Sequence, residues 1–302
     1  MDPIPTPRRL ATGRCDSCPG SVTLCRVTTI AITHQAVDGV DVRMARHDGD
    51  LEATLILTCP WPESLYAFES TWSALSEQAN LIAVDLPGYG GSARRAELLT
   101  PQTMGAFLVR LMDQWEIESP HVFAPDVGTS AALFAAGRNP GRMRSLIVGS
   151  GAVAVPLQIA GALKDLVEAP DLGPIAALDP REVVAGSLEL IERYELSPAA
   201  REDYLSSYQG DRFAESCRYV RSYGTELPIL GELLPEIQTP TLVLQGDHDP
   251  YVPPANGAYL HERLPNSKLH AFDAGHFFWE DSGDEFAALA SAWVEGQYRD
   301  AR

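Results

Sequence analysis

The apolar positions of this chain alternate between short continuous runs and longer stretches with helical spacing. Four short runs, rich in branched residues, predict buried strands. They lie at 53–58, 81–84, 121–123 and 241–246. Residues 101–116 instead place apolar side chains three and four positions apart, which predicts a helix with one buried face. Residues 27–32 and 40–46 read as an antiparallel pair of strands. Strands alternating with helices favour a parallel sheet covered on both faces.

One long segment interrupts this alternation. Residues 153–234 show helical spacing and several prolines, but no good buried strand. We therefore expect a core built from residues 26–152 and 235–302, with a helical cap inserted between two of its strands. A cap over the strand ends would shield a reacting group from water.

Residues 124–128 read Ala-Pro-Asp-Val-Gly and carry the most informative chemistry of the chain. They follow the strand at 121–123 and precede an alanine-rich helical stretch, so Asp126 lies at a strand-to-helix turn. Small residues two positions before and after a nucleophile mark the nucleophile elbow, because the strained turn leaves no room for larger side chains. Most elbows carry serine. An aspartate predicts attack on an alkyl carbon in place of acyl transfer, which argues against an esterase.

Two later strands end in groups that could complete a catalytic triad. The strand at 241–246 runs into Asp247, His248 and Asp249, and the next strand runs into Ala-Gly-His276. Both ends lie on the side of the sheet where open α/β folds bind ligands. We predict that His276 is the catalytic base and that Asp249 orients it. Asp247 is the alternative acid, unless it is only a turn-forming carboxylate.

Together these residues resemble the aspartate-nucleophile branch of the α/β-hydrolase superfamily, the epoxide hydrolases and haloalkane dehalogenases. The resemblance spans roughly residues 35–298 and rests on five motifs. They are Trp-Pro-Glu-Ser (61–64), Asp-Leu-Pro-Gly-Tyr-Gly-Gly-Ser (85–92), Pro-Asp-Val-Gly (125–128), Gly-Asp-His-Asp (246–249) and Ala-Gly-His (274–276). The order nucleophile, acid, histidine is also that of this fold. The resemblance implies an α/β-hydrolase fold, with a mostly parallel sheet flanked by helices and an inserted helical cap.

The resemblance also implies a reaction in two steps. Asp126 would attack a carbon of an epoxide and form an alkyl–enzyme ester. His276 would then activate a water molecule that hydrolyses this ester, releasing a diol. By analogy with the fold, the backbone N–H groups of Trp61 and Val127 would form the oxyanion hole. Ser130 lies four residues past the elbow, inside the helix, so it is not expected to be a nucleophile.

Two positions depart from the family pattern. Cys59-Pro60 stands where the family has His-Gly, but the required N–H donor is that of Trp61, which Pro60 leaves intact. Cys59 could be a second nucleophile, although a small buried residue at a strand end is the favoured explanation. Val127 stands where many haloalkane dehalogenases have a tryptophan that binds halide. A haloalkane or haloacid dehalogenase is therefore an alternative, disfavoured function.

Epoxide opening also needs a proton donor for the alkoxide, a role that cap tyrosines fill in this family. The predicted cap contains Tyr194, Tyr204, Tyr208, Tyr219 and Tyr223. Tyr219 and Tyr223 lie four positions apart, on one helix face, and are the candidate acids, with packing as the alternative role. The family's acid tyrosine aligns with Val220, one residue out of place. That mismatch and the loss of His-Gly leave a third option, a lapsed hydrolase that acts as a ligand-binding protein, cyclase or isomerase.

Charge and composition limit the partners. The net charge of −18 argues against nucleic acid and anionic membrane surfaces, and no apolar run approaches the length of a spanning helix. We expect a small apolar electrophilic substrate, and no cofactor or metal is implied. Residues 1–25, with three cysteines, are expected to be a poorly ordered leader without a secretory signal, so a cytoplasmic location is the default. The oligomeric state is left open, with a homodimer as one option.

Overall fold

Eight strands form a single sheet in the computed structural model, which describes residues 30–301. Their order is β1-β2-β4-β3-β5-β6-β7-β8. The strands are β1 Ile32–Val37, β2 Val40–His47, β3 Thr54–Thr58, β4 Asn80–Val84, β5 His121–Pro125, β6 Ser145–Gly149, β7 Thr241–Gly246 and β8 Ser267–Phe272. β2 pairs antiparallel with β1 and β4, and the remaining pairs are parallel. The predicted α/β-hydrolase arrangement, a mostly parallel sheet, is confirmed.

The first hairpin takes its register from the turn at Asp38 and Gly39. Both residues have positive φ, 47° and 76°, which suits a tight two-residue connection between twisted strands. The turn pairs Val37 with Val40, and the pairing continues as far as Ile32 with Ala45, where β1 begins. Half of the strand predicted at 27–32 lies outside the described residues, and in the other half the prediction is wrong for Ile30 and Ala31, since only Ile32 belongs to β1.

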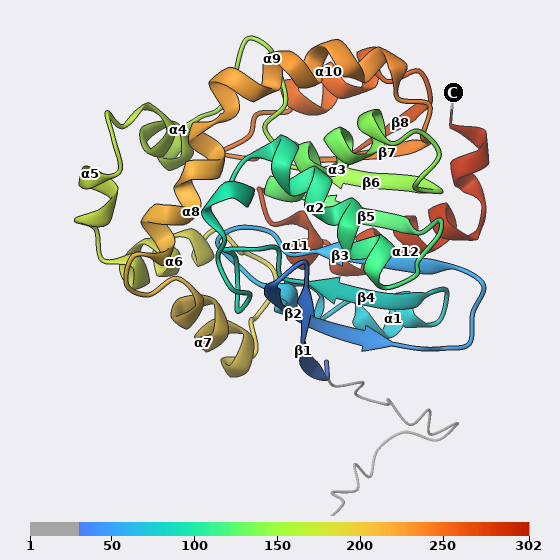
Figure 1. Cartoon of the computed structure of the whole chain (residues 1–302), viewed down its shortest axis with the longest axis horizontal. Helices are drawn as coiled ribbons and strands as arrows, with labels where there is room; N and C mark the ends of the chain where they lie inside the picture. The colour runs from blue at the N-terminus through green and yellow to red at the C-terminus, as the bar shows by residue number, and fades with distance from the viewer. Residues whose placement is uncertain (1–29, 302) are drawn as a thin grey trace, which may run out of the picture.

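Helices cover both faces of the sheet (Figure 1). The core helices are α1 Trp72–Ser76, α2 Pro101–Gln114, α3 Val127–Arg138, α10 Ala255–Arg263, α11 Phe278–Asp281 and α12 Gly283–Glu295. Apolar side chains of α2, α3 and α10 pack in one cluster, and those of α1, α11 and α12 pack in another on the opposite face. Successive residues of a strand point to opposite faces, so Val122 belongs to the first cluster and Phe123 to the second.

Helix α2 illustrates how local sequence sets an element. The Thr100 side chain accepts a hydrogen bond from the Thr103 N–H, and Pro101 occupies the first turn, where its missing N–H costs nothing. Its predicted apolar stripe is buried at Phe107 and Leu111, chiefly against α3, and half-buried at Trp115, the C-cap residue. The helix predicted over residues 101–116 is therefore confirmed to within two residues.

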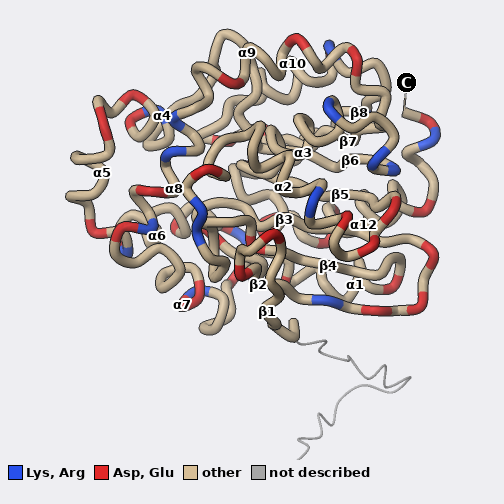
Figure 2. The backbone as a smooth tube through the Cα atoms, viewed as in Figure 1, with Lys and Arg blue, Asp and Glu red and all other residues tan. Residues whose placement is uncertain are grey.

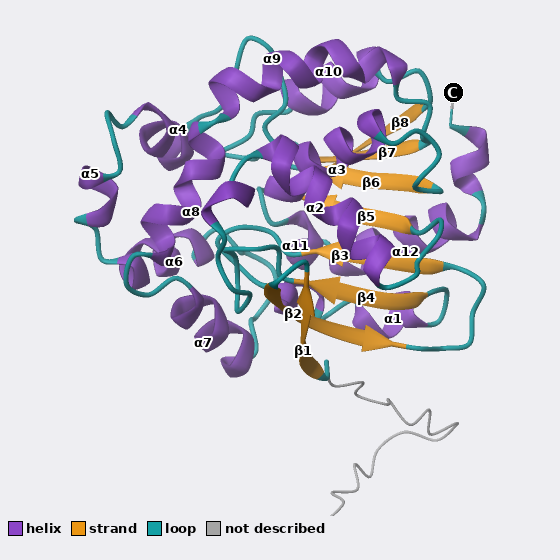
Figure 3. Cartoon of the chain, viewed as in Figure 1, coloured by secondary structure: helices purple, strands orange, loops and turns teal. Residues whose placement is uncertain are grey.

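Six helices lie between β6 and β7, in the segment predicted as the cap; we call residues 153–234 the insertion. They are α4 Gly161–Glu168, α5 Gly173–Ala176, α6 Pro180–Leu188, α7 Pro198–Ser207, α8 Arg212–Arg221 and α9 Tyr223–Leu233. Figures 1 and 3 show α4 to α8 beyond the carboxyl ends of the parallel strands, while α9 runs back beside the core. That the insertion forms a separate domain stays a prediction. The predicted leader at 1–25 lies outside the described residues.

Helix α7 attaches the insertion to the core through polar side chains. Asp203 pairs with Arg43 of β2 and accepts a hydrogen bond from Ser64. The Tyr208 hydroxyl donates to the Glu63 carbonyl at 2.7 Å. These bonds fix one side of the insertion over the loop that follows β3.

Acidic positions are scattered over both the core and the insertion, among basic ones, in the view of Figure 2. None of the helices within residues 30–301 has the length and apolar character needed to cross a membrane.

Replacing Gly128 by alanine tests the close packing of the strand-to-helix turn. A Cβ at position 128 would lie 2.3 Å from Thr58 Oγ1 and 3.2 Å from the Ala124 Cβ. Thr58 is a stiff, buried strand residue, so we expect Gly128→Ala to lower the free energy of unfolding by about 1–3 kcal/mol in urea titration. Gly186→Ala is the control, since Gly186 lies in α6 with no heavy atom within 4 Å of the added carbon. It should raise stability by up to about 1 kcal/mol.

Candidate active site

Asp126 occupies a sharp turn between β5 and α3. Its backbone lies at φ 49° and ψ −121°, outside the regions that non-glycine residues favour. The Asp126 N–H donates to the Gly149 carbonyl of β6 at 2.8 Å, and its carbonyl accepts the Thr129 N–H at 3.0 Å. A Cβ at Gly151 would lie 2.7 Å from the Asp126 carbonyl oxygen. Strain held by surrounding structure in this way is typical of functional positions.

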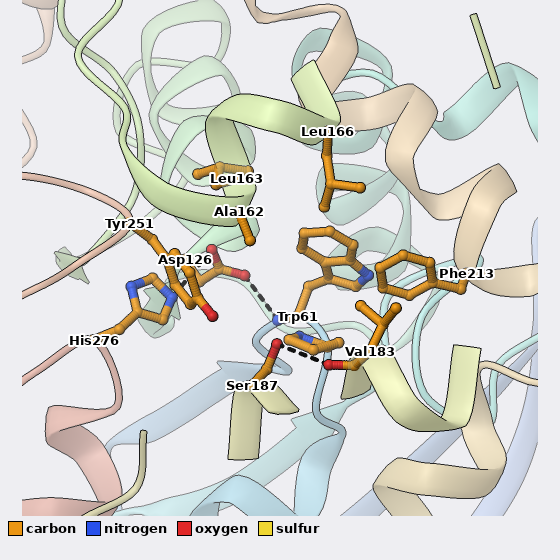
Figure 4. A pocket seen from close by; sticks show the side chains of 11 residues that line it. Trp61, Asp126, Ala162, Leu163, Leu166, Val183, Ser187, Phe213, Tyr251 and His276 are labelled. Carbon is orange, nitrogen blue, oxygen red and sulfur yellow. Dashed lines mark hydrogen bonds and ion pairs between the residues drawn. The ribbon is translucent and has the colours of Figure 1, made fainter. Parts of the chain in front are cut away.

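The two carboxylate oxygens of Asp126 face different partners (Figure 4). Oδ2 accepts the backbone N–H of Trp61 at 2.7 Å. Oδ1 lies 3.7 Å from Nε2 of His276. The structure therefore places the predicted Trp61 donor against the carboxylate. Val127 is the first residue of α3, and its N–H as a second donor stays a prediction.

Asp249, and not Asp247, contacts the histidine. Nδ1 of His276 lies 2.8 Å from Asp249 Oδ2. The other oxygen, Oδ1, accepts the N–H groups of Tyr251 and Val252, each at 2.8 Å. Asp247 is exposed, and its backbone N–H continues the pairing of β7 with β8. The structure thus brings together the three residues predicted as the triad.

The pKa of His276 reflects two opposing effects. Burial lowers it, but the charge of Asp249 and the nearby carboxylate of Asp126 outweigh burial and raise the pKa to about 10. His276 is therefore positively charged at neutral pH while both carboxylates are ionised. If Asp126 became esterified, one of these charges would disappear and the pKa of His276 would fall. The histidine would then become a base at the stage that requires one.

We expect Asp126→Asn to lower the pKa of His276 from its wild-type value near 10, because the amide carries no charge. Titration of the imidazole resonances by NMR measures the change directly. Asp247→Asn removes an exposed carboxylate without a bond to His276 and should leave the titration where it is. An unchanged His276 titration in Asp126→Asn would contradict the coupling of these two groups.

A small cavity of about 40 Å³ opens above Asp126 and His276. Helices α4 and α6 of the insertion line it from two sides, α4 with Leu163 and Leu166 and α6 with Val183 and Ser187, as Figure 4 shows. Its lining is mostly apolar and consists of Trp61, Pro62, Asp126, Ala162, Leu163, Leu166, Val183, Ser187, Phe213, Tyr251 and His276. The Trp61 indole stacks on Phe213, and its Nε1–H donates to Ser216 at 2.9 Å. Within residues 30–301, His, Cys, Asp and Glu form no group of three that could hold a metal.

The chain order of the three residues, the sheet that carries them and the helical insertion beside them agree with the family that the sequence matches. The model of the Alpha/beta hydrolase family matches residues 60–289, about three quarters of the chain. The chain belongs to the alpha/beta hydrolase family.

Relatives of this hydrolase act on several kinds of substrate. It is 29% identical over 230 residues to 2-hydroxy-6-oxononadienedioate/2-hydroxy-6-oxononatrienedioate hydrolase 2 of Pseudomonas putida, covering 71% of this chain and 77% of that one. It is 28% identical over 229 residues to the poly(3-hydroxyalkanoate) depolymerase of Ectopseudomonas oleovorans, covering 74% and 77%. The structure of epoxide hydrolase A from Mycobacterium thermoresistibile superposes with a TM-score of 0.73 at 17% identity, covering 89% and 99%. That likeness shows the fold alone.

The cap tyrosines of this hydrolase point mostly at the core. The Tyr219 hydroxyl donates to the Val127 carbonyl at 2.7 Å and lies 3.0 Å from the Ser130 hydroxyl. The Tyr223 ring packs edge-on against Tyr219 and is buried. Neither side chain is among those that line the cavity, so the acid role predicted for them is not supported by this geometry. The tyrosine that does line the cavity is Tyr251, which our sequence reasoning missed.

Tyr251 could have been noticed from its position. It follows Asp249 by two residues, at the end of β7, where ligands bind in this fold. The family resemblance instead places the acid tyrosines in the insertion.

Cys59 is a buried core residue. Its sulfur accepts the Leu86 N–H at 3.3 Å, and the side chain is fully inaccessible to solvent. Burial raises the pKa of the thiol well above its usual value. A buried thiol of this kind is inert, which supports the packing role over that of a second nucleophile.

Two buried glutamates meet below the triad. The Trp279 indole donates to Glu63 Oε2 at 3.0 Å, and the Tyr204 hydroxyl donates to Glu280 Oε1 at 3.2 Å. Burial and the neighbouring Glu280 carboxyl raise the pKa of Glu63 well above its usual value. Burial also raises the pKa of Glu280 to about 8. Two like charges so close cannot both persist, so the pair retains at least one proton at neutral pH.

This retained proton makes stability depend on pH. Between the ordinary glutamate pKa of 4.5 and about 8, the folded protein binds more protons at this pair than the unfolded chain does. The free energy of unfolding should therefore fall as pH rises through this window. We expect Glu280→Gln, which can still accept the Tyr204 hydrogen bond, to reduce that fall by at least about 1 kcal/mol in urea titrations at about pH 5 and about pH 8. Glu189→Gln, at an exposed position in α6's C-cap, should leave the pH dependence unaltered.

Proposed function

We propose that this hydrolase opens an epoxide through an alkyl ester on Asp126 and hydrolyses the ester to a diol. The observation that carries the proposal is how the two oxygens of the Asp126 carboxylate are placed. One oxygen is held by the Trp61 N–H and the other is directed toward the cavity and His276. A carboxylate held in this way can attack carbon with Oδ1 while Oδ2 keeps its hydrogen bond.

In the first step, Asp126 Oδ1 bonds to an epoxide carbon, and the carbon–oxygen bond of the ring breaks. The electron pair of that bond goes to the epoxide oxygen, which takes up a proton. Once Asp126 is esterified, the pKa of His276 falls and the imidazole releases its resting proton to solvent. In the second step, neutral His276 removes a proton from water, and the water oxygen attacks Cγ of Asp126. Negative charge then develops on Oδ2, where the Trp61 N–H already points. Breaking the bond between Cγ and the alkyl-bearing oxygen releases the diol, whose oxygen takes the proton held by His276.

The surroundings of Asp126 favour an epoxide over a haloalkane. A departing halide is normally held by two hydrogen-bond donors, but the Trp61 indole N–H is committed to Ser216, which leaves the Tyr251 hydroxyl as one uncommitted donor. Val127 offers no side-chain donor. No Lys or Arg lines the cavity, and the one positive charge there, on His276, already lies between two carboxylates, so the dicarboxylate named for the P. putida relative would find no free countercharge. The triad contacts also favour catalysis over a lapsed hydrolase, since ligand binding alone needs no base between two carboxylates.

Intact-protein mass spectrometry of His276→Gln tests this function. We expect incubation with a panel of small uncharged epoxides and haloalkanes to add the mass of one whole epoxide, mapped to Asp126 by peptide analysis. The adduct should accumulate, because the first step needs only the carboxylate and the second needs the base. Asp126→Asn should form no adduct and should show no turnover once deamidation has been excluded. His248→Gln, at an exposed histidine, is the matched control and should turn over normally.

The mass gained separates the candidate reactions. An increase equal to a haloalkane less one hydrogen halide would assign the site to dehalogenation. No adduct from any compound, in folded protein, would contradict a hydrolase that works through Asp126 on these electrophiles. A single turnover of the wild-type protein in H₂¹⁸O should yield unlabelled diol first, since the second oxygen of the diol comes from Asp126.

A further inference from the structure

The cavity contains few polar groups besides Asp126 and His276. The Ser187 hydroxyl donates to the Val183 carbonyl within its own helix, at 3.3 Å. The phenol of Tyr251 stands beside Asp126 and His276 in Figure 4, and its oxygen extends into the cavity without a hydrogen bond to the residues drawn. Since Nε2 of His276 faces Asp126 Oδ1, the Tyr251 hydroxyl is the uncommitted side-chain donor of the lining that a bound substrate can meet.

Tyr251 is fixed in place from several sides. Its backbone N–H donates to Asp249 Oδ1 at 2.8 Å, and its carbonyl accepts the Ala160 N–H at 2.8 Å. Its ring lies edge-on to that of His276, with centroids 5.4 Å apart. Gly161 begins α4 at φ 52°, and a Cβ there would come within 3.4 Å of the Tyr251 ring. The insertion therefore approaches this ring closely, through a residue that tolerates the backbone conformation.

Asp249 consequently positions two groups with one carboxylate. Oδ2 holds the imidazole of His276, and Oδ1 holds the backbone of Tyr251. The base and the phenol are fixed relative to each other on the same side of the Asp126 carboxylate, as Figure 4 shows. An epoxide attacked by Oδ1 has its oxygen on the far side of the attacked carbon, within the cavity that the phenol enters.

We propose that Tyr251 donates the proton to the epoxide oxygen as the ring opens, a role that rests on the proposed function. The electron pair of the breaking carbon–oxygen bond becomes the oxygen lone pair that takes the phenol proton. Water returns a proton to the phenolate before the next turnover. The substrate class that this arrangement fits is a small, uncharged epoxide, because the lining beyond Asp126, His276, Tyr251 and Ser187 is apolar. Tyr219 cannot share the task in this geometry, since its hydroxyl is bonded to Val127.

A proton donor to the alkoxide acts in the first step and not in the second. The alkyl–enzyme already carries a hydroxyl group, so its hydrolysis needs His276 and the Trp61 N–H but no phenol. A residue that merely supports the position of His276 would instead slow the hydrolysis of the ester. The two roles are therefore separated by which step a substitution slows.

The test measures adduct formation with Tyr251→Phe combined with His276→Gln. We expect the double variant to form the epoxide adduct about 10²-fold more slowly than His276→Gln alone, which is the usual contribution of general acid catalysis. In the protein with His276 present, Tyr251→Phe should slow adduct formation equally but hydrolyse the formed ester at the wild-type rate. Tyr259→Phe, which removes a hydroxyl on α10 outside the cavity, should change neither step.

Three outcomes would overturn the inference. Adduct formation at the parental rate in Tyr251→Phe would exclude the phenol as donor and leave the proposed function intact. Slow adduct formation in Tyr223→Phe but not in Tyr251→Phe would assign the role to the insertion. No adduct in His276→Gln itself would overturn the proposed function, and this inference with it.

Discussion

Strand β5 passes into helix α3 through one residue, Asp126, whose backbone conformation is strained. The turn is held by bonds to Gly149 and Thr129, and Gly128 and Gly151 lie so close to neighbouring atoms that a Cβ at either would collide. The Asp126 side chain, the proposed nucleophile, is therefore held in position at the carboxyl end of a central strand. Trp61 and His276 are placed by their contacts with this carboxylate.

The Trp61 loop reaches that carboxylate because a buried ion pair fixes it. Asp85, at the end of β4, accepts the Leu65 N–H at 2.7 Å and pairs with Arg43. Arg43 also pairs with Asp203 of α7, so the same network ties the insertion to the loop that carries Trp61. Buried ion pairs of this kind contribute little net stability, since desolvation offsets their attraction. Their effect here is positional, because each charge fixes a separate segment.

Charge in the site is balanced around His276. The carboxylates of Asp249 and Asp126 raise the pKa of the histidine to about 10, and in the proposed reaction an ester on Asp126 would remove one of these charges and lower that pKa. Nearby, Glu63 and Glu280 avoid an additional negative charge by retaining a proton. The apolar lining contributed by α4 and α6 keeps water away, which strengthens the remaining electrostatic interactions.

The sequence alone determined the features that depend on neighbours along the chain. The elbow pattern, the apolar runs of the strands and the stripe of α2 follow from local geometry, and the strand ends predicted Asp249 and His276. Only the tertiary structure decided which tyrosine faces the cavity. Spacing of four residues predicted Tyr219 and Tyr223 on one helix face, which is wrong, because α8 ends at Arg221 and α9 begins at Tyr223, so the two tyrosines lie on different helices. The direction in which each tyrosine points depends on packing between segments distant in the sequence. This packing turned Tyr219 toward Val127 and left Tyr251 in the cavity. The contact between Glu63 and Glu280 depends on tertiary packing in the same way.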